Sequence, residues 1–342
     1  MSIDQRLESI RNWLDTELKL SYDCLEVASA DASFRRYFRL VSDKHSWVIM
    51  DAPPEKEDCQ SFVKVARLIE TAGVQAPHIY EFNEGQGFMR LSDLGCISYL
   101  DELSMNQSAR VNVLYSDAIQ AIVRMQSIPV NACEAHSSGA RLPEYDAALL
   151  HTEMGLFKDW YLKTHLKIQL DAGQSTVIEN TFNILAESAL KQVQVFVHRD
   201  YHSRNLMVTE QNNPGVIDFQ DAVNGPASYD LVSLIKDCYI AWPRARQLAW
   251  LDQYLTLSDL NLDWQAFIRQ YDFMGMQRHL KAVGIFARLN HRDNKPGYME
   301  DIPRTLAYVF DVCDRYEELG EFKKMLLDLG VQPDPVLLDR IQ

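Results

Sequence analysis

The sequence predicts an α+β protein with two lobes, a small β-rich lobe over residues 1–95 and a larger helical lobe over residues 96–342. Short β-rich runs fill most of the first part, whereas apolar residues recur at helical spacing almost to the end after Gly95. One β-rich island, residues 195–218, interrupts the helical part. A chain of 342 residues is long enough for two lobes and a sizeable core.

The first lobe is expected to hold an N-terminal amphipathic helix, five strands and one inserted helix. Apolar residues recur at helical spacing over residues 3–18. A second helical pattern runs from Glu57 to Ala72, and Gly73 after it is suited to a C-cap. The turn Asn83-Glu84-Gly85 separates the last two β-rich runs. The expected strands are residues 24–29, 36–41, 46–50, 77–82 and 86–91.

The second lobe shows helical spacing in eight segments on either side of the β-rich island. No internal repeat and no low-complexity segment interrupts them. The expected helices are residues 107–127, 146–165, 177–192, 228–240, 244–255, 264–289, 301–318 and 320–329.

Composition excludes several classes of protein. A formal net charge of -14 repels phosphate backbones and anionic lipid, so nucleic-acid and membrane partners are not expected. No run of 18 apolar residues predicts a membrane span, and the N-terminus lacks the apolar core of a signal peptide. Six cysteines occur singly without a C-x-x-C pair, which fits thiols in a reducing cytoplasm.

The β-rich island carries a spaced set of polar residues. A short apolar strand, residues 195–197, leads into His198-Arg199-Asp200, and Asn205 follows five residues after Asp200. The turn Asn212-Asn213-Pro214-Gly215 then predicts a hairpin that ends at Asp218. We expect this hairpin to bring Asn205 and Asp218 towards the same edge, near Asp200.

These residue types suit phosphoryl transfer, in which positioning and charge neutralisation are the main tasks. Asn205 offers an amide oxygen and Asp218 a carboxylate, the hard ligands that Mg²⁺ prefers. Asp200 is then left to accept, or to orient, the hydroxyl proton of the acceptor. The alternative is structural: Asp200 and Asn205 as turn residues and Asp218 as a helix N-cap.

The spacing H-R-D-x-x-x-x-N is the catalytic-loop pattern of protein kinases. The segments HRDYHSRNLMV and GVIDFQDAVNGPASYDLVSL resemble the aminoglycoside phosphotransferase/choline kinase branch of the protein-kinase-like fold. The resemblance implies a bilobal fold and ATP with Mg²⁺ as cofactors. It also implies that Asp230 ties the catalytic loop to the next helix and that His198 supports the loop. By the same resemblance Asp221 either contacts a group that binds the metal or is a solvated loop residue.

Four further segments narrow the resemblance. SADASFRRYFRL, VIMDAPPEKEDCQSF, RLSDLG and QRHLKAVGIFARLNHRDNKPGY are similar to bacterial anomeric sugar kinases of cell-wall recycling. Those enzymes phosphorylate the 1-hydroxyl of N-acetylmuramate and N-acetylglucosamine with ATP. The resemblance spans nearly the whole chain and implies a small-molecule acceptor, an amino sugar.

The nucleotide side of the first lobe departs from the kinase pattern. The loop at residues 30–35 contains no glycine, so Ser33, Arg35 and Arg36 are the candidates for phosphate contacts, and one of the two arginines could point inward. A surface arginine pair is the alternative. Residues 48–51, where kinases place the lysine of the third strand, also contain no lysine. The acidic partner that such a lysine would have is Glu57 or Glu70.

Residues 89–95 stand where kinases bind the adenine edge through the backbone. In this stretch Leu91 and Asp93 are the candidate cofactor-binding residues. Because such contacts are made by the main chain, the preference for ATP over GTP follows from the resemblance alone.

Positive charge concentrates late in the helical lobe, at residues 278–295, in a chain of net charge -14. This local reversal could bind a carboxylated sugar; a solvated basic helix face is the alternative. Trp242 and Tyr298 could stack on a sugar ring, but the sequence favours core packing for each. The candidate substrate contacts are His202, Asp221, Arg278, His279, Lys281 and Arg292.

Three functions remain open from the sequence. The first is an ATP- and Mg-dependent kinase of an amino sugar, acting on the anomeric hydroxyl. The second is an aminoglycoside or other small-alcohol kinase of the same family. The third, favoured by the missing lysine, is a catalytically dead nucleotide-binding protein.

Overall fold

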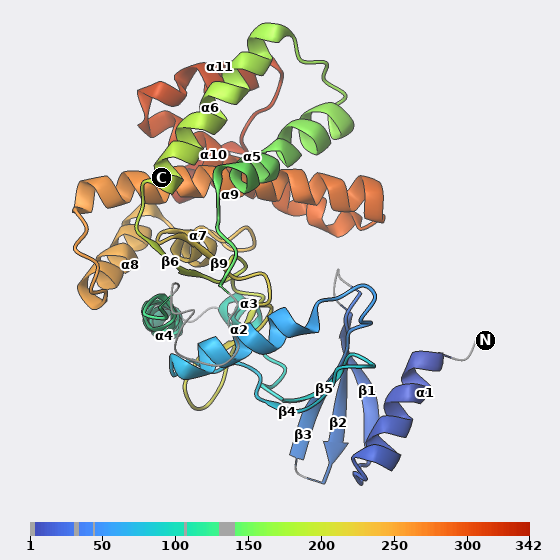
Figure 1. Cartoon of the computed structure of the whole chain (residues 1–342). Coiled ribbons are helices and arrows are strands. Elements are labelled where there is room, and N and C mark those ends of the chain that lie inside the picture. The colour runs from blue at the N-terminus through green and yellow to red at the C-terminus, as the bar shows by residue number, and fades with distance from the viewer. Residues whose placement is uncertain (1–3, 31–33, 44, 106–107, 130–140) are drawn as a thin grey trace. The chain divides into compact units, whose positions relative to one another are not determined.

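The computed structural model divides into two compact units (Figure 1). The first unit comprises residues 1–96 and 207–220, and the second comprises residues 97–206 and 221–342. The first unit ends its main segment at residue 96, and residues 207–220, which the sequence analysis places in the second lobe, also belong to it. The structure describes residues 4–30, 34–43, 45–105, 108–129 and 141–342.

A five-stranded antiparallel sheet forms the first unit, in the order β1-β2-β3-β5-β4. Every predicted strand is present, with ends within two residues of the prediction. The turn of the last hairpin extends to Gly87, which lies at φ +71 and where a Cβ would meet the carbonyl oxygen of Ala52 at 1.9 Å. The strands are β1 (Cys24–Ala30), β2 (Arg36–Ser42), β3 (His45–Asp51), β4 (Ile79–Asn83) and β5 (Phe88–Ser92).

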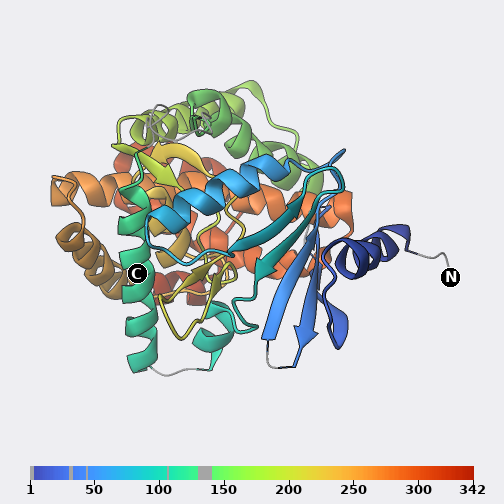
Figure 2. The ribbon, with the colours of Figure 1, turned by 60° about the horizontal axis from the view of Figure 1, so that its bottom comes forward.

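Helix α1 (Gln5–Asn12) continues into a π-helical turn, η1 (Trp13–Glu17), and lies beside the sheet in Figures 1 and 2. Its apolar side packs on the face of the sheet that carries alternate residues of β2 and β3, since successive strand residues point to opposite faces. The shared core consists of Ile10, Trp13, Leu14, Phe38, Leu40, Ile49 and Phe88.

Helix α2 (Cys59–Thr71) is the inserted helix of the first unit. Asp58 begins it by accepting hydrogen bonds from the backbone N–H groups of Gln60 and Ser61. Gly73 follows the C-cap at φ +70, the left-handed conformation expected of a helix-ending glycine.

The second unit is built around α9 (Trp264–Asp293), a 30-residue helix. Every residue from 271 to 281 is buried, because α5, α6, α7, α10 and η2 all pack against this helix (Figures 1 and 2). Gly284 permits the closest approach, since a Cβ there would lie 2.3 Å from the backbone carbon of Leu156.

The remaining helices of the second unit largely match the predicted segments. Two short ones, α3 and α12, were not predicted, although Ser98 and Asp101 form a capping box at the start of α3. The helices are α3 (Tyr99–Ser104), α4 (Ser108–Gln126), α5 (Ala147–Leu156), η2 (Phe157–His165), α6 (Ala172–Leu190), α7 (Tyr229–Ile235), α8 (Arg244–Leu257), η3 (Pro296–Asp301), α10 (Ile302–Arg315), η4 (Glu317–Leu319), α11 (Gly320–Asp328) and α12 (Pro335–Ile341).

The predicted β-rich island forms two small sheets. Strand β6 (Gln194–Val197) pairs antiparallel with β9 (Val223–Pro226), which the sequence did not predict. Strands β7 (Leu206–Met207) and β8 (Gly215–Val216) pair as the predicted hairpin. Across the described ranges, no helix combines the length and the apolar character that a bilayer crossing requires.

Candidate active site

The loop after β6 is clamped by a buried carboxylate. Asp230 at the start of α7 accepts hydrogen bonds from the backbone N–H groups of His198, at 2.8 Å, and Arg199, at 3.0 Å. Arg199 has φ +77, a conformation that is uncommon and costly for a residue with a side chain. The two hydrogen bonds hold the loop in this conformation, so Asp230 has the structural role that the sequence suggested.

A tight turn sets the positions of Asp200 and Asn205. The carbonyl of Asp200 accepts hydrogen bonds from the backbone N–H of His202 and from Nδ2 of Asn205, both at 3.0 Å. The backbone N–H of Asn205 donates to the carbonyl of His202 at 2.9 Å. Because Nδ2 is engaged within the loop, the amide oxygen of Asn205 is the atom with which this side chain would reach a metal ion.

His198 lies inside the loop and is fully buried. Its Nδ1 accepts a hydrogen bond from the backbone N–H of Asp200 at 3.2 Å, and its ring meets Tyr201 edge-on. These contacts fit a supporting residue. Ser203 is held in turn, because its backbone N–H donates to Oδ2 of Asp237 at 2.9 Å.

Positive charge surrounds Asp200 on the side of α9. Burial alone would raise the pKa of the Asp200 carboxyl, but the charges of Lys281 and Arg278, among others, lower it to about 2. The carboxylate is therefore ionised at neutral pH. A proton acceptor must be ionised before it can accept, so this environment suits the role predicted for Asp200.

Glu153 on α5 organises the cations near Asp200. Its Oε1 lies 3.1 Å from Nζ of Lys281 and 2.5 Å from Nη2 of Arg199. Lys281 also donates to the hydroxyl of Tyr229 at 3.0 Å. Although burial opposes it, Lys281 and Arg199 lower the pKa of Glu153 to about 2. Glu153 was not a candidate from the sequence, because its partners come from distant segments.

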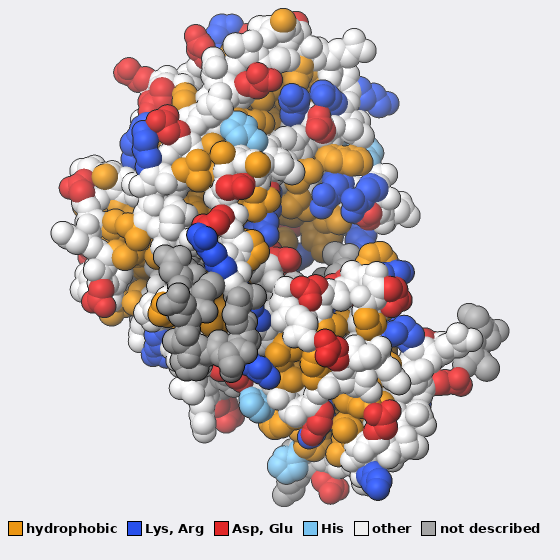
Figure 3. Space-filling view, viewed as in Figure 1, with side chains coloured by type: hydrophobic (Ala, Val, Ile, Leu, Met, Phe, Trp, Pro, Cys, Tyr) orange, Lys and Arg blue, Asp and Glu red, His pale blue; other side chains and the backbone are white. Residues whose placement is uncertain are grey.

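The basic segment at residues 278–295 does not form one solvated face. Arg278 and Lys281 are buried, whereas Arg292 is exposed and pairs with Asp293 at 2.8 Å. Figure 3 shows basic side chains gathered over the C-terminal end of α9. His279 is a packed residue: its ring stacks on Tyr308, and Nε2 lies 2.8 Å from the carbonyl of Lys236.

Three other candidate substrate contacts lie in different environments. Trp242 is a core residue, because its indole N–H donates to the hydroxyl of Tyr115 at 2.6 Å. His202 lies in the loop after β6, and its buried Nδ1 has no hydrogen-bond partner within the described ranges. Asp221 is exposed, and its carbonyl oxygen lies 3.4 Å from Nη1 of Arg199.

In the first unit, Arg35 is the inward-pointing arginine of the pair. It is 8% exposed and its Nη2 lies 2.8 Å from Oε2 of Glu57, just before α2. The backbone N–H of Phe34 donates to Oε1 of the same carboxylate at 3.1 Å. Burial would lower the pKa of Arg35, but nearby negative groups, including Glu57 and Asp218, raise it. Glu70 pairs with His78 instead.

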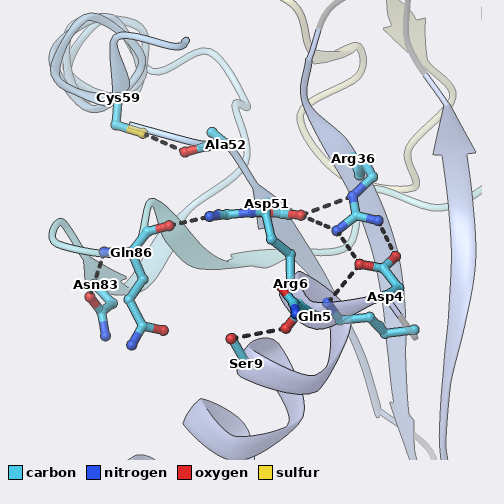
Figure 4. A network of polar contacts seen from close by, with 11 residues as sticks. Asp4, Gln5, Arg6, Ser9, Arg36, Asp51, Ala52, Cys59, Asn83 and Gln86 are labelled. Carbon is cyan, nitrogen blue, oxygen red and sulfur yellow. Dashed lines mark hydrogen bonds and ion pairs between the residues drawn. The ribbon is translucent and has the colours of Figure 1, made fainter. Parts of the chain in front are cut away.

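Arg36 points to the other face of the sheet, towards α1. Figure 4 shows its guanidinium between Asp51 and Asp4, with Nη2 at 2.6 Å from the buried Oδ2 of Asp51. Arg6 of α1 binds the same carboxylate, so Asp51 joins helix to sheet. The prediction of Arg36 as a phosphate contact is therefore wrong for this conformation, because its donors serve the α1 interface.

Asp218 follows β8 in the first unit, at φ +65. Its Oδ1 accepts a hydrogen bond from Nε2 of Gln220 at 2.9 Å, and the next residue, Phe219, packs its ring on Phe62 of α2 at 4.8 Å. Aspartate tolerates this left-handed conformation better than most residues. The buried Phe219 thus fixes the backbone that presents the Asp218 carboxylate.

The remaining nucleotide candidates lie at the end of β5. Leu91 is buried and pairs with Val48 of β3. The Asp93 carboxylate accepts from Nε of Arg39 at 2.7 Å, and this bond helps to lower its pKa although burial opposes it. The side chain of Asp93 is thereby structural. Ser33 lies outside the described residues.

The structure can be tested for a metal site by its donors. The described residues contain no cluster of three or more His, Cys, Asp or Glu side chains that could hold an ion. Magnesium keeps several waters and binds substrate phosphates, so one or two protein oxygens suffice. Asn205 in the second unit offers an amide oxygen, and Asp218 in the first unit offers a carboxylate; each is an oxygen donor of the kind that Mg²⁺ takes.

The sequence is similar to that of known kinases over nearly its whole length. The model of the phosphotransferase enzyme family matches residues 25–267. An N-acetylmuramate/N-acetylglucosamine kinase of Pseudomonas putida is 41% identical, over 95% of this chain and 97% of its own. The one of Pseudomonas aeruginosa is 43% identical, over 96% of this chain and 98% of its own.

Solved structures share the fold at low sequence identity. An ADP-bound aminoglycoside phosphotransferase, APH(2'')-Ib, has a TM-score of 0.60 at 14% identity, covering 91% of this chain and 99% of its own. Choline kinase LicA from Streptococcus pneumoniae has a TM-score of 0.59 at 12% identity, covering 89% of this chain and 98% of its own. The predicted α+β kinase-like fold is confirmed, and the chain belongs to the phosphotransferase enzyme family.

Proposed function

We propose that this enzyme transfers the γ-phosphoryl group of ATP to the anomeric hydroxyl of N-acetylmuramate and N-acetylglucosamine. The acceptors are those named for relatives that align with 95–96% of the chain. The observation that carries the chemistry is the ionised Asp200 in a loop clamped by Asp230. We place the reaction in the cytoplasm, as a step of peptidoglycan recycling.

Asp200 acts on the acceptor. Its carboxylate accepts the proton of the sugar hydroxyl as the oxygen attacks phosphorus, or orients that hydroxyl for attack. Lys281 and Arg278 keep Asp200 ionised, and the hydrogen bonds of the loop fix its position. The anomeric hydroxyl is more acidic than an ordinary alcohol, which reduces the demand on the base.

Arg35 supplies the nucleotide-side cation that the third strand lacks. Its buried ion pair with Glu57 joins a basic side chain to a glutamate, as the lysine–glutamate pair of protein kinases does. The charge of Arg35 also acts on Asp218. We propose that Arg35 neutralises nucleotide phosphate charge, while main-chain groups near Leu91 and Asp93 hold the base. Magnesium, held by Asn205 and Asp218, would neutralise charge on the transferred group when bound.

The positive field at Asp200 favours neutral or anionic acceptors over aminoglycosides, which carry several positive charges. This field separates the proposed function from that of the aminoglycoside kinases that share the fold. The ionised Asp200 and the Arg35–Glu57 pair argue against a catalytically dead nucleotide binder.

The test is an acceptor panel with purified protein, ATP and Mg²⁺. ADP release is followed with each amino sugar and with an aminoglycoside, and the product is identified by phosphorus NMR. We expect sugar 1-phosphates, and the Asp200→Asn variant should be folded and slower by about 10²–10⁴. Activity on the aminoglycoside alone would reject the acceptor, and full activity of Asp200→Asn would reject the assigned base.

A further inference from the structure

Arg204 lies in the catalytic loop on an aromatic platform. Its guanidinium carbon is 3.7 Å from the ring centre of Tyr239 and 5.7 Å from that of Tyr298 on η3. Tyr298 is itself stacked on Phe286 of α9, with ring centres 5.8 Å apart and planes 15° from parallel. Three segments that are distant in sequence thus converge on one cation.

The platform is anchored to the same turn as Asp200. Asp237 accepts hydrogen bonds from the backbone N–H of Ser203 and from that of Tyr239, both at 2.9 Å. The ring of His202 also meets Tyr239 edge-on, with centres 5.3 Å apart. One carboxylate therefore fixes the loop and the ring beneath Arg204, so the guanidinium is positioned relative to the base.

The charge of Arg204 is not neutralised by a direct partner. Its side chain is exposed, and within the described ranges it makes neither a hydrogen bond nor an ion pair. The charge of Arg204 acts on the carboxyl of Asp301. That carboxyl, however, already accepts a hydrogen bond from Nη1 of Arg304 at 2.9 Å. Arg269 offers a contrast, because it also stacks on an aromatic ring but pairs with Glu318 at 2.5 Å.

A stacked guanidinium keeps its in-plane N–H groups available at the edge, where a carboxylate can accept two of them. The two proposed acceptors differ in this respect, since N-acetylmuramate carries a lactyl carboxylate and N-acetylglucosamine does not. We propose that Arg204 binds the acceptor carboxylate and determines the preference between the two sugars. This inference rests on the proposed function and assigns to Arg204 a contact with one acceptor.

Buried cations nearby are less suited to this task. Lys281 is engaged by Glu153 and Tyr229, and Arg278 is 5% exposed with Nη1 3.8 Å from Sγ of Cys238. Both act on Asp200 through their charge. Arg204 instead combines exposure, rigid stacking and an uncommitted edge, which a specificity contact requires.

The test compares kcat/KM for the two sugars in the wild type and in Arg204→Gln, Arg204→Lys and Arg269→Gln. The quantity is the ratio of kcat/KM for N-acetylmuramate to that for N-acetylglucosamine. We expect Arg204→Gln to lower this ratio by at least about tenfold, since a charge-assisted bidentate contact is lost. The ratio for Arg204→Lys should lie between the wild-type ratio and that of Arg204→Gln. Arg269→Gln should keep the wild-type ratio.

A second arm uses the wild-type protein with the methyl ester of N-acetylmuramate, which removes the charge from the sugar. The ester should lower the ratio as Arg204→Gln does, and the ester with Arg204→Gln should show little further loss. Partial misfolding lowers the rate with both sugars and leaves the ratio unchanged. The ratio for Arg204→Lys gives a second measurement of the same contact.

An unchanged ratio in Arg204→Gln, or additive losses with the ester, overturns the role of Arg204 while the sugar kinase activity stands. A wild-type protein that phosphorylates neither sugar overturns the proposed function and this inference together. The two failures are therefore distinguished by the wild-type rates.

Discussion

The guanidinium of Arg35 lies 2.8 Å from the carboxylate of Glu57, and both side chains are almost wholly buried. A buried pair of this kind is costly to break, because the remaining charge loses its partner. Residues 48–51 contain no lysine, so this buried pair is our candidate for the cation–carboxylate pair that would face the nucleotide.

Replacing Arg35 should weaken nucleotide use. We expect Arg35→Met to raise KM for ATP by about tenfold or more, because a charge-assisted contact to phosphate is lost. Arg36→Met is the matched control, since Arg36 binds Asp51 and Asp4 on the α1 face. The control should lower the melting temperature and leave KM for ATP within about twofold. An equal rise of KM in both variants would contradict the assignment.

Magnesium dependence should map to Asn205 and Asp218. Chelation with EDTA should abolish turnover, and added Mg²⁺ should restore it. We expect Asp218→Asn to raise the Mg²⁺ concentration for half-maximal rate, because a neutral amide binds the ion more weakly. Asp252→Asn, at an exposed site on α8, should keep the wild-type dependence. A wild-type Mg²⁺ dependence in Asp218→Asn would remove Asp218 from the metal site.

Stability should depend on pH through Glu153. Its pKa is about 2 in the folded protein and 4.5 ordinarily, so its contribution is present above pH 4.5 and is lost as pH falls towards 2. That contribution is on the order of 3 kcal/mol. Urea unfolding between about pH 6 and about pH 2.5 should therefore show a shallower decline in Glu153→Gln than in the wild type.

The control for that series is Glu179→Gln, an exposed position on α6, which should follow the wild-type curve. Parallel curves for the wild type and Glu153→Gln would show that Glu153 does not titrate as its cation partners require.

Two glycines beside one another in the fold should respond in opposite directions to alanine. A Cβ at Gly284 would lie 2.3 Å from backbone of Leu156, so Gly284→Ala should destabilise by about 1–3 kcal/mol. Gly155 on α5 has nothing within 4 Å of an added Cβ, so Gly155→Ala should stabilise by roughly 0.5–1 kcal/mol. Equal effects in thermal unfolding would mean that α9 can shift away from α5.

Local patterns were enough for most elements of the fold. The short β-rich runs located the strands of the first unit within two residues, because β-branched and aromatic stretches bounded by turn residues mark strands. The helices with long periodic runs were equally clear. The short helices α3 and α12 and the strand β9 escaped, since a few residues carry too weak a pattern.

The residues of the site also divide into those that local sequence predicts and those that only the folded chain brings together. The sequence by itself determined the loop from His198 to Asn205 and Asp218, because the spacing of a turn is written in consecutive residues. Only the tertiary structure decided that Arg35 faces inward while Arg36 serves α1, since the sheet sends neighbouring side chains to opposite faces. It also decided which cations keep Asp200 ionised and which rings support Arg204, because these partners meet only when distant segments fold together.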